Sequence, residues 1–418
     1  MLNRNKKLLA IVLATILVFS LTACNNSSSG GASTGNNSGN SSNSNNSTTS
    51  GETYKIGAYL PLSGGNAAYG IEARNTIDMM VKMINAEGGF NGQTVEFIPY
   101  DSQSSPEEAV KVVNKLIEVD KINACIGSIL SSEILATGKT LNDAGIITYG
   151  LGTSPSWMAE DWPYLFRATM NSGFAMGLEA DMLVKLGMTR VATFKGLDDS
   201  SLATQASFKE ECELRGIEVV ADESHDSGDT DFSAQIANLM AADPECIWFA
   251  TMGEVTPVFV KQLRQYGFTG IIMDKEAFSV AMIEIAGKAA STHIMFANPY
   301  VTYNSADECD IPIMKEFLEL YIAEYGVCPA TECGYRAWDS ILALWEAAKI
   351  AGSNDPEAMR EAAHKVNVPA LGGTLDFTNG DREGYREFNT FMMIDGESRV
   401  FDEWVANDYE AYKEANAN

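Results

Sequence analysis

A regular alternation of short strand-like runs with longer helical runs begins at Tyr54, and it constrains the fold more than any other feature of the sequence. Residues 54–60 form the first strand-like run, and the segment after it repeats apolar positions every three or four residues, as a helix does. Residues 105–108, Ser-Pro-Glu-Glu, predict a helix start in which Ser105 is the N-cap. Strands that alternate with helices in this way predict a parallel sheet covered by helices on both faces.

The alternation runs through two units of similar size. Strands are expected in the first unit at 54–60, 94–99, 122–127 and 146–149, and in the second at 191–194, 217–220, 247–250 and 271–273. A third stretch is too short for another such unit and completes the first two, with helices expected at 313–325 and 338–351 and strands at 374–377 and 391–394. We therefore expect an α/β fold of two lobes joined by several crossings, with lobe 1 at 53–170 plus 300–373 and lobe 2 at 171–299 plus 374–418. Ligands of such sheets bind beyond the carboxyl ends of the strands, here in a cleft between the lobes.

The first 52 residues are not expected to join this fold. Residues 1–23 combine a short basic region with an apolar run of 12 residues, which is too short for the about 20 residues that span a bilayer and is typical of a signal peptide. Small residues before Cys24 are typical of a lipobox, which predicts a diacylglycerol on the Cys24 thiol; an ordinary secretory signal is the alternative. Residues 24–52 then form a flexible Asn/Ser/Gly linker. These features predict a location on the outer face of the cell membrane, which is the periplasmic side if the organism has an outer membrane.

The charge balance excludes several classes of function. The chain has 29 Lys and Arg against 56 Asp and Glu, which gives a formal net charge of −27 and argues against nucleic acid as a partner. Three scattered histidines leave little material for a metal site or a catalytic triad. No dinucleotide or phosphate-loop fingerprint is complete, so we expect no cofactor, no metal and no enzymatic activity.

The cysteines other than Cys24 leave one question open. Cys125 and Cys246 lie in apolar strands, which predicts buried thiols. Cys309, Cys328 and Cys333 cluster late in the chain, and an exported protein permits one disulfide among them, although the sequence does not select the pair.

Polar residues follow two neighbouring strands of the first unit. Ser131 and Ser132 follow strand 122–127, and Gly152 and Thr153 follow strand 146–149. Their hydroxyls and the free backbone N–H groups at a helix start suit a carboxylate. Ordinary helix capping is the alternative explanation of the same residues, and both interpretations stay open.

Several motifs, in consistent order over residues 54–400, resemble the branched-chain amino-acid-type substrate-binding proteins of ABC importers. The resemblance rests on residues 56–64, 69–70, 84–92, 100–109, 126–132, 231–234 and 371–377. It implies a type I periplasmic binding protein, with two Rossmann-like lobes that close on a ligand. It also implies a monomer that binds a small amino acid and works with permease subunits in the membrane.

The resemblance further implies roles for individual residues. Ser131 and Thr153 match the family's positions that hold the α-carboxylate of the ligand, with Ser132 and Gly152 beside them. Glu276 matches the acidic residue of lobe 2 that holds the α-ammonium, although an exposed loop carboxylate is the alternative for a glutamate in this sequence.

Three further positions concern the ligand's side chain. Tyr69 matches an aromatic residue that stacks on it. Ser200 stands where the family often has a tyrosine, which predicts a larger or more polar pocket, and Tyr335 is a candidate to fill that space. The ligand is therefore expected to be a branched-chain or related amino acid, with a small amide, urea-like or aromatic ligand as the alternative. A binding protein for a separate receptor and an anchored hydrolase are the rival functions.

Overall fold

The computed structural model describes residues 53–226 and 228–416. The predicted signal peptide (1–23), the predicted lipidation site Cys24 and the predicted linker (24–52) lie outside the described residues. The described residues form two lobes, each built on its own main sheet.

Lobe 1 is built on a five-stranded sheet in which every strand pair is parallel. In spatial order the strands are β2 (Val95–Asp101), β1 (Tyr54–Leu60), β3 (Ala124–Gly127), β4 (Ile147–Tyr149) and β5 (Leu165–Phe166). Four of these strands were expected, and β5 is too short to give a sequence pattern. The parallel sheet predicted from the alternation is therefore confirmed for this lobe.

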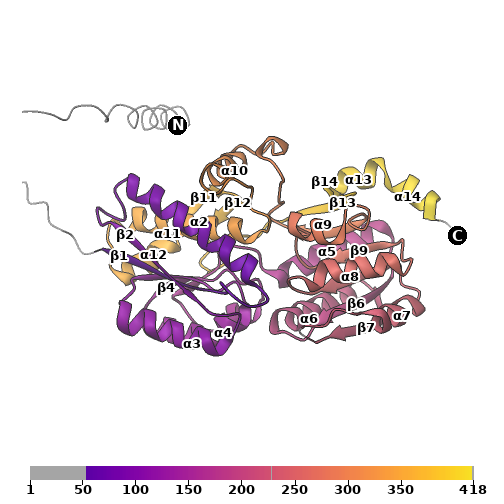
Figure 1. Ribbon diagram of the computed structural model, residues 1–418, viewed down its shortest axis with the longest axis horizontal. Helices are drawn as coiled ribbons and strands as arrows, with labels where there is room; N and C mark the ends of the chain where they lie inside the picture. The colour runs from indigo at the N-terminus through magenta and orange to yellow at the C-terminus, as the bar shows by residue number, and fades with distance from the viewer. Residues whose placement is uncertain (1–52, 227, 417–418) are drawn as a thin grey trace, which may run out of the picture. The chain divides into compact units, whose positions relative to one another are not determined.

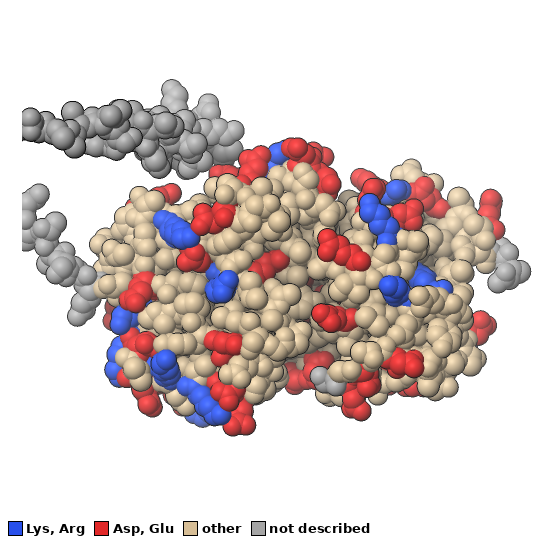
Figure 2. Space-filling view, in the orientation of Figure 1, with Lys and Arg blue, Asp and Glu red and all other residues tan. Residues whose placement is uncertain are grey.

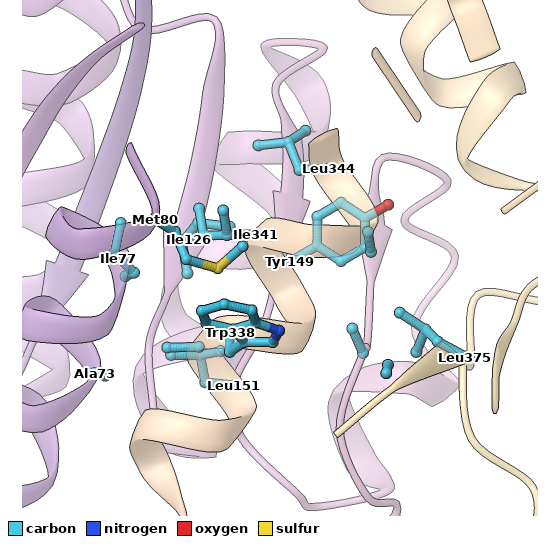
Figure 3. Packing of buried hydrophobic residues seen from close by; sticks show 14 of the residues in the cluster. Ala73, Ile77, Met80, Ile126, Tyr149, Leu151, Trp338, Ile341, Leu344 and Leu375 are labelled. Atoms are coloured by element: carbon cyan, nitrogen blue, oxygen red, sulfur yellow. The ribbon is translucent and has the colours of Figure 1, made fainter. Parts of the chain in front are cut away.

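Helices cover both faces of the first sheet, as Figure 1 shows for α2, α11 and α12 on one face and α3 and α4 on the other. Ser105 caps α3 as predicted, because its Oγ accepts a hydrogen bond from the Glu108 N–H. Figure 3 shows α2 and α11 contributing Ile77, Met80, Trp338 and Ile341 to the core on one face. The helical segments are α2 (Ala67–Ala86), α3 (Pro106–Lys115), η1 (Leu116–Asp120), α4 (Ser131–Asp143), η2 (Ser156–Ala159), η3 (Ala306–Glu308), α10 (Pro312–Tyr325), α11 (Cys333–Ala351) and α12 (Pro356–Ala363).

Lobe 2 is built on a seven-stranded sheet. In spatial order its strands are β14 (Glu397–Val400), β13 (Asn389–Ile394), β10 (Ile294–Asn298), β9 (Ile271–Asp274), β8 (Cys246–Ala250), β6 (Arg190–Gly196) and β7 (Glu218–His225). Its helices are α5 (Ser172–Leu186), α6 (Asp199–Leu214), α7 (Ser233–Ala241), α8 (Val255–Gln265), α9 (Val280–Ala286), α13 (Phe401–Asn407) and α14 (Tyr409–Asn416).

The second sheet differs from the expected all-parallel arrangement at one edge. β13 pairs antiparallel with β10, and β14 pairs antiparallel with β13. The turn between β13 and β14 is Asp395-Gly396, and both residues have positive φ (52° and 78°). An Asp-Gly pair with two positive φ values is the two-residue turn that favours an antiparallel hairpin. This edge therefore follows from local turn chemistry, which the strand–helix alternation does not contain.

The hydrophobic clusters show where the chain passes between the lobes. Crossings lie between Ala168 and Met170, between Ala297 and Tyr300, and after Tyr385, where the chain returns to lobe 2. The third crossing comes later than the expected boundary at residue 373. The reason is a small antiparallel hairpin of β11 (Asn367–Ala370) and β12 (Gly373–Asp376), whose apolar side chains pack into lobe 1.

The described surface carries many acidic side chains, and Figure 2 shows basic side chains interspersed with acidic ones on the face in view. Within residues 53–226 and 228–416, no helix is long and apolar enough to cross a bilayer. In the same residues, no group of three or more His, Cys, Asp and Glu side chains is placed to hold a metal ion. The six cysteines of the described part are free thiols, so the structure contains no disulfide among Cys309, Cys328 and Cys333.

Candidate functional site

Two short segments of lobe 1 lie at the carboxyl ends of β3 and β4 and form one side of the site. Ser131 is the first residue of α4, and its side-chain Oγ accepts a hydrogen bond from the Ser154 N–H at 3.2 Å. Gly152 lies against the same hydroxyl, because a Cβ at this position would come within 2.6 Å of Ser131 Oγ. The absence of a side chain at Gly152 thus lets the two segments approach each other.

A buried arginine fixes the loop after β4. Arg167 Nη1 donates to the carbonyl oxygens of Thr153 (3.0 Å) and Ser154 (2.7 Å), while Nε and Nη2 pair with Glu383. Arg167 is fully buried, so these charge-assisted bonds are shielded from water. The loop that carries Thr153 is therefore held rigidly from behind.

A large cavity of about 770 Å³ extends between the lobes from these segments. Ser131 and Ser132 line it from lobe 1, and Ser200 lines it from the start of α6 in lobe 2. We call this part of the cleft, with Ser131, Ser132 and Ser200, the hydroxyl end. Lys275 is fully buried behind it and donates from Nζ to Ser200 Oγ at 3.2 Å.

Glu276 follows β9 in lobe 2 and makes two contacts with lobe 1. Its Oε1 accepts a hydrogen bond from Thr153 Oγ1 at 2.7 Å, and its Oε2 lies 3.1 Å from Arg336 Nη2. Burial opposes ionisation of this carboxyl, but Arg336, Lys275 and the Thr153 hydrogen bond outweigh burial and lower its pKa. Glu276 is thus an ionised, partnered carboxylate at the junction of the lobes.

Arg336 lies on α11 and connects several groups. Besides Glu276 it pairs with Glu332, which is four residues earlier on the chain, and its Nη1 donates to the Leu151 carbonyl at 3.3 Å. Arg336 is 3% exposed and Glu332 is 4% exposed. Asn298 also donates to Glu332, at 2.8 Å. Arg336 was not predicted as a site residue, although it is adjacent in sequence to the predicted Tyr335.

Asp274 precedes Glu276 by two residues and has the opposite electrostatic character. It is 2% exposed, and burial together with the charge of Glu276 raises its pKa well above the ordinary value. A small cavity of about 30 Å³ is lined by Asp274, Glu276, Glu332 and Arg336 together with Tyr69. We call the part of the cleft formed by Asp274, Glu276, Glu332 and Arg336 the carboxylate end.

Glu72 supports the carboxylate end from behind. Its carboxylate accepts hydrogen bonds from the Ala330 N–H (2.7 Å), the Thr331 Oγ1–H (2.6 Å) and the Gly334 N–H (3.1 Å), at the start of α11. Burial raises the pKa of Glu72 to about 7 against the effect of these bonds. Glu72 therefore fixes the end of the helix that carries Arg336.

The predicted site residues fall into three groups. Thr153 and Glu276 are in direct contact across the cleft, and Gly152 lies against Ser131. Ser131, Ser132 and Ser200 line the large cavity, whereas Tyr69 and Glu276 line the small one. Tyr335 lies instead in the lobe 1 core.

The burial of Tyr335 is complete. Its ring packs against those of Phe317, with centroids 5.1 Å apart, and Tyr300, with centroids 6.0 Å apart. It lines neither of the two cavities described above. Successive residues of a helix point about 100° apart, so Arg336 reaches the cleft where Tyr335 does not.

Comparison with known proteins agrees with this architecture. The profile of the family described as periplasmic binding protein matches residues 53–397. An amino acid binding protein of Pseudomonas aeruginosa is 25% identical over 348 residues, which cover 82% of this chain and 90% of the relative. A leucine-, isoleucine-, valine-, threonine- and alanine-binding protein of the same organism is 26% identical over 341 residues, 80% of this chain and 88% of the relative.

A solved structure extends the comparison to the fold. The leucine-binding protein LivK of Thermotoga maritima superposes with a TM-score of 0.72 at 25% identity, covering 83% of this chain and 97% of LivK. Proteins of this kind bind substrates and are not enzymes. Because the family profile spans both lobes, the chain belongs to the periplasmic binding protein family.

Proposed function

We propose that this protein captures an amino acid in the cleft between its lobes and delivers it to the permease of an ABC importer. The observation that carries the proposal is the 2.7 Å contact between Thr153 Oγ1 in lobe 1 and Glu276 Oε1 in lobe 2. It brings together, from opposite sides of the cleft, the residues assigned to the two charged groups of an amino acid.

The carboxylate end suits the ammonium group. Arg336, Lys275 and the Thr153 hydroxyl keep Glu276 ionised, whereas the raised pKa of Asp274 favours its neutral form. A buried charge is costly unless it is paired, so an ammonium group that takes the place of the Thr153 hydroxyl against Glu276 is favoured there.

The hydroxyl end suits the carboxylate group. Ser131 and Ser132 begin α4, where backbone N–H groups lack partners within the helix and the helix dipole favours an anion. Ser131 is nearly buried, which strengthens a hydrogen bond to an ionised group. Gly152 lets the neighbouring loop approach Ser131 closely at this point.

Ligand binding is then coupled to closure of the cleft. A ligand held by both lobes stabilises the closed arrangement relative to the open one, and only such a difference in affinity shifts the equilibrium. Because Thr153 and Glu276 touch each other, these two side chains separate to admit a ligand between them. The ammonium group replaces Thr153 as a partner of Glu276.

We extend the proposal to the location and the partners of the chain. A signal peptide at 1–23 and a lipid on Cys24 place the protein on the outer face of the membrane, and residues 24–52 tether it there. It acts as a monomer without a cofactor. A separate receptor that senses closure is the rival partner. It predicts that deleting the protein abolishes a response and leaves amino-acid uptake unchanged.

A ligand-binding experiment tests the proposal directly. The twenty standard amino acids, benzoate and urea are screened by thermal shift, and hits are measured by titration calorimetry. A ligand at about 100 times its Kd adds about 2.7 kcal/mol of stability. We expect at least one amino acid to bind. Its deaminated and decarboxylated analogues, which each lack one charged group, are expected to bind at least about 30-fold more weakly. Binding of benzoate or urea without binding of any amino acid contradicts the proposal.

A further inference from the structure

A carboxylate of lobe 2 contacts lobe 1 at a place separate from the contact of Thr153 with Glu276. Asp199 is the first residue of α6, and its Oδ2 accepts a hydrogen bond from Ser156 Oγ at 2.9 Å. Ser156 is the first residue of η2, which follows β4 in lobe 1. Figure 1 shows α4 and α6 side by side where the lobes meet, and the two helices are in contact. Asp199 and Ser156 thus form a further contact between the lobes.

On the lobe 1 side, the contact is attached to the loop after β4. Ser154 Oγ lies 2.8 Å from Ser156 Oγ and 3.5 Å from Asp199 Oδ2. Each hydroxyl has one proton, so Ser156 donates to the nearer carboxylate oxygen and accepts from Ser154. The backbone of Ser154 is itself fixed, because its N–H donates to Ser131 Oγ and its carbonyl oxygen accepts from Arg167. Asp199 is therefore bonded to a rigid part of lobe 1.

On the lobe 2 side, the start of α6 is also fixed. Asp198 is the N-cap, and its carboxylate accepts from the Ser201 N–H at 3.0 Å and from the Ser201 hydroxyl at 2.6 Å. The half-buried Asp199 follows directly. A negative charge in the first turn of a helix also stabilises that helix by itself. A test of the contact with Ser156 has to separate these two roles of Asp199.

The contact is placed to persist when a ligand binds. Neither Asp199 nor Ser156 lines the large or the small cavity described above. The contact of Thr153 with Glu276 differs, because the proposed ammonium group replaces Thr153 there. The Asp199–Ser156 contact is therefore available in the closed arrangement with or without a ligand, and it is lost when the lobes separate.

We infer that Asp199 is a positioning residue that latches the cleft: through Ser156 it stabilises the closed arrangement without touching the ligand. This inference rests on the proposed closure of the cleft around an amino acid. A contact that exists only in the closed arrangement raises the ratio of closed to open protein. A ligand leaves from the open arrangement, so the latch slows release, and it does so by the same factor for every ligand.

Release rates of the full chain test the latch. The probes are radiolabelled leucine and threonine or, where these do not bind, the two standard amino acids that bind most tightly. Their release into an excess of the unlabelled amino acid gives the rate. We expect Ser156→Ala, which leaves the charge at the start of α6 in place, to release both probes about fivefold faster. Asp199→Ala should accelerate release at least as much. Circular dichroism and a thermal melt establish that each variant is folded.

A double-mutant cycle separates the latch from other roles of the two residues. Because both substitutions remove one contact, we expect the double variant to release no faster than the faster single variant. Glu210→Gln is the matched control, since Glu210 is an exposed acidic residue of the same helix, and its release rates should stay within about twofold of the wild type.

Three outcomes overturn the inference. Unchanged release in Ser156→Ala shows that the contact does not hold the lobes together, even if Asp199→Ala alters α6. Independent, multiplying effects of the two substitutions show that the residues do not act through each other. Different factors for the two probes show that the residues contact the ligand and are not a latch.

A cross-linking experiment without ligand keeps the latch distinguishable from the proposed function. We expect the pair Ser156→Cys and Asp199→Cys to form a disulfide under mild oxidation of the empty chain, identified by peptide mass mapping, and the pair Ser156→Cys and Glu210→Cys to form none. Failure of the first pair overturns the latch. Failure of every standard amino acid to bind refutes the proposed function instead.

Discussion

The two ends of the cleft use opposite means to prepare a polar surface for a ligand. At the hydroxyl end the groups are neutral and local: Ser131 and Ser132 begin one helix, and their backbone N–H groups are free because of their position in it. At the carboxylate end the groups are charged, and Glu276 depends on Arg336, which is 60 residues away in sequence. A buried neutral donor costs free energy unless it is hydrogen-bonded, and a buried charge costs far more unless it is paired, so the carboxylate end needs partners that only the tertiary fold supplies.

The largest effect is expected when the carboxylate end loses its charge. Glu276→Gln keeps the shape of the side chain but removes the charge that pairs with an ammonium group. Removing one partner of a buried charged pair costs about 2–5 kcal/mol, so amino-acid affinity is expected to fall at least about 30-fold. Titration calorimetry on the wild type and the variant measures this loss.

Glu254→Gln is the matched control, because Glu254 is an exposed residue at the wall of the large cavity. It loses the same charge in water, where the contribution is small. We expect its affinity to stay within about twofold of the wild type. Equal losses in both variants would show that the net charge of the cleft matters and that the Glu276 contact does not.

The pH dependence of stability tests the support behind the carboxylate end. The pKa of Glu72 is raised by burial from 4.5 to about 7, so the folded protein holds this proton more tightly than the unfolded chain does. The resulting stabilisation is fully present below about pH 4.5 and is lost as the pH rises through about 7; the shift corresponds to about 3 kcal/mol.

Glu72→Gln cannot titrate at this position. The unfolding free energy of the wild type minus that of the variant should therefore fall by about 3 kcal/mol between about pH 4 and about pH 8. Urea titrations at several pH values measure both curves. Two curves that stay parallel over this range would show that Glu72 keeps an ordinary pKa. Burial behind the carboxylate end would then not perturb a charged group in the way that the comparison of the two ends assumes.

The sequence predicts the architecture of both lobes well, because the strand–helix alternation is a local signal. The extents of β1 and β8 are predicted to within one residue, and the cap at Ser105 is predicted from three neighbouring residues. The antiparallel hairpin of β13 and β14 was not predicted, although the Asp395-Gly396 pair carries a recognisable turn signal. The lobe boundary expected at residue 373 falls inside the β11–β12 hairpin, whose packing into lobe 1 depends on contacts distant in sequence.

The site residues of the two ends of the cleft also differ in how far the sequence predicts them. The positions of Ser131 and Thr153 follow from strand ends and can be inferred locally. Arg336 lies in a helix whose residues are mostly buried, so its sequence neighbourhood resembles a core helix and gives no sign of the cleft. Asp274 lies two residues before the predicted Glu276, but the lack of a hydrogen-bond partner for its Oδ2 among the described residues is a property of the folded cavity alone.

The smallest effect on affinity is expected at the hydroxyl end, where several neutral donors each contribute one hydrogen bond to the ligand. Ser131→Ala removes one hydroxyl that would donate to the ligand carboxylate and that accepts from the Ser154 N–H, and it leaves the free N–H groups at the start of α4 in place. A hydrogen bond to a charged group contributes about 1.5–3 kcal/mol, so we expect affinity to fall about tenfold or somewhat more.

Tyr335→Phe is the control: it also removes one buried hydroxyl, and this hydroxyl has no hydrogen-bond partner among the described residues. Its removal should leave affinity unchanged and leave stability unchanged or slightly increased, because no bond is lost and a polar group is no longer buried. A loss in Tyr335→Phe as large as that in Ser131→Ala would mean that the lobe 1 core, and not the start of α4, sets the affinity at this end of the cleft.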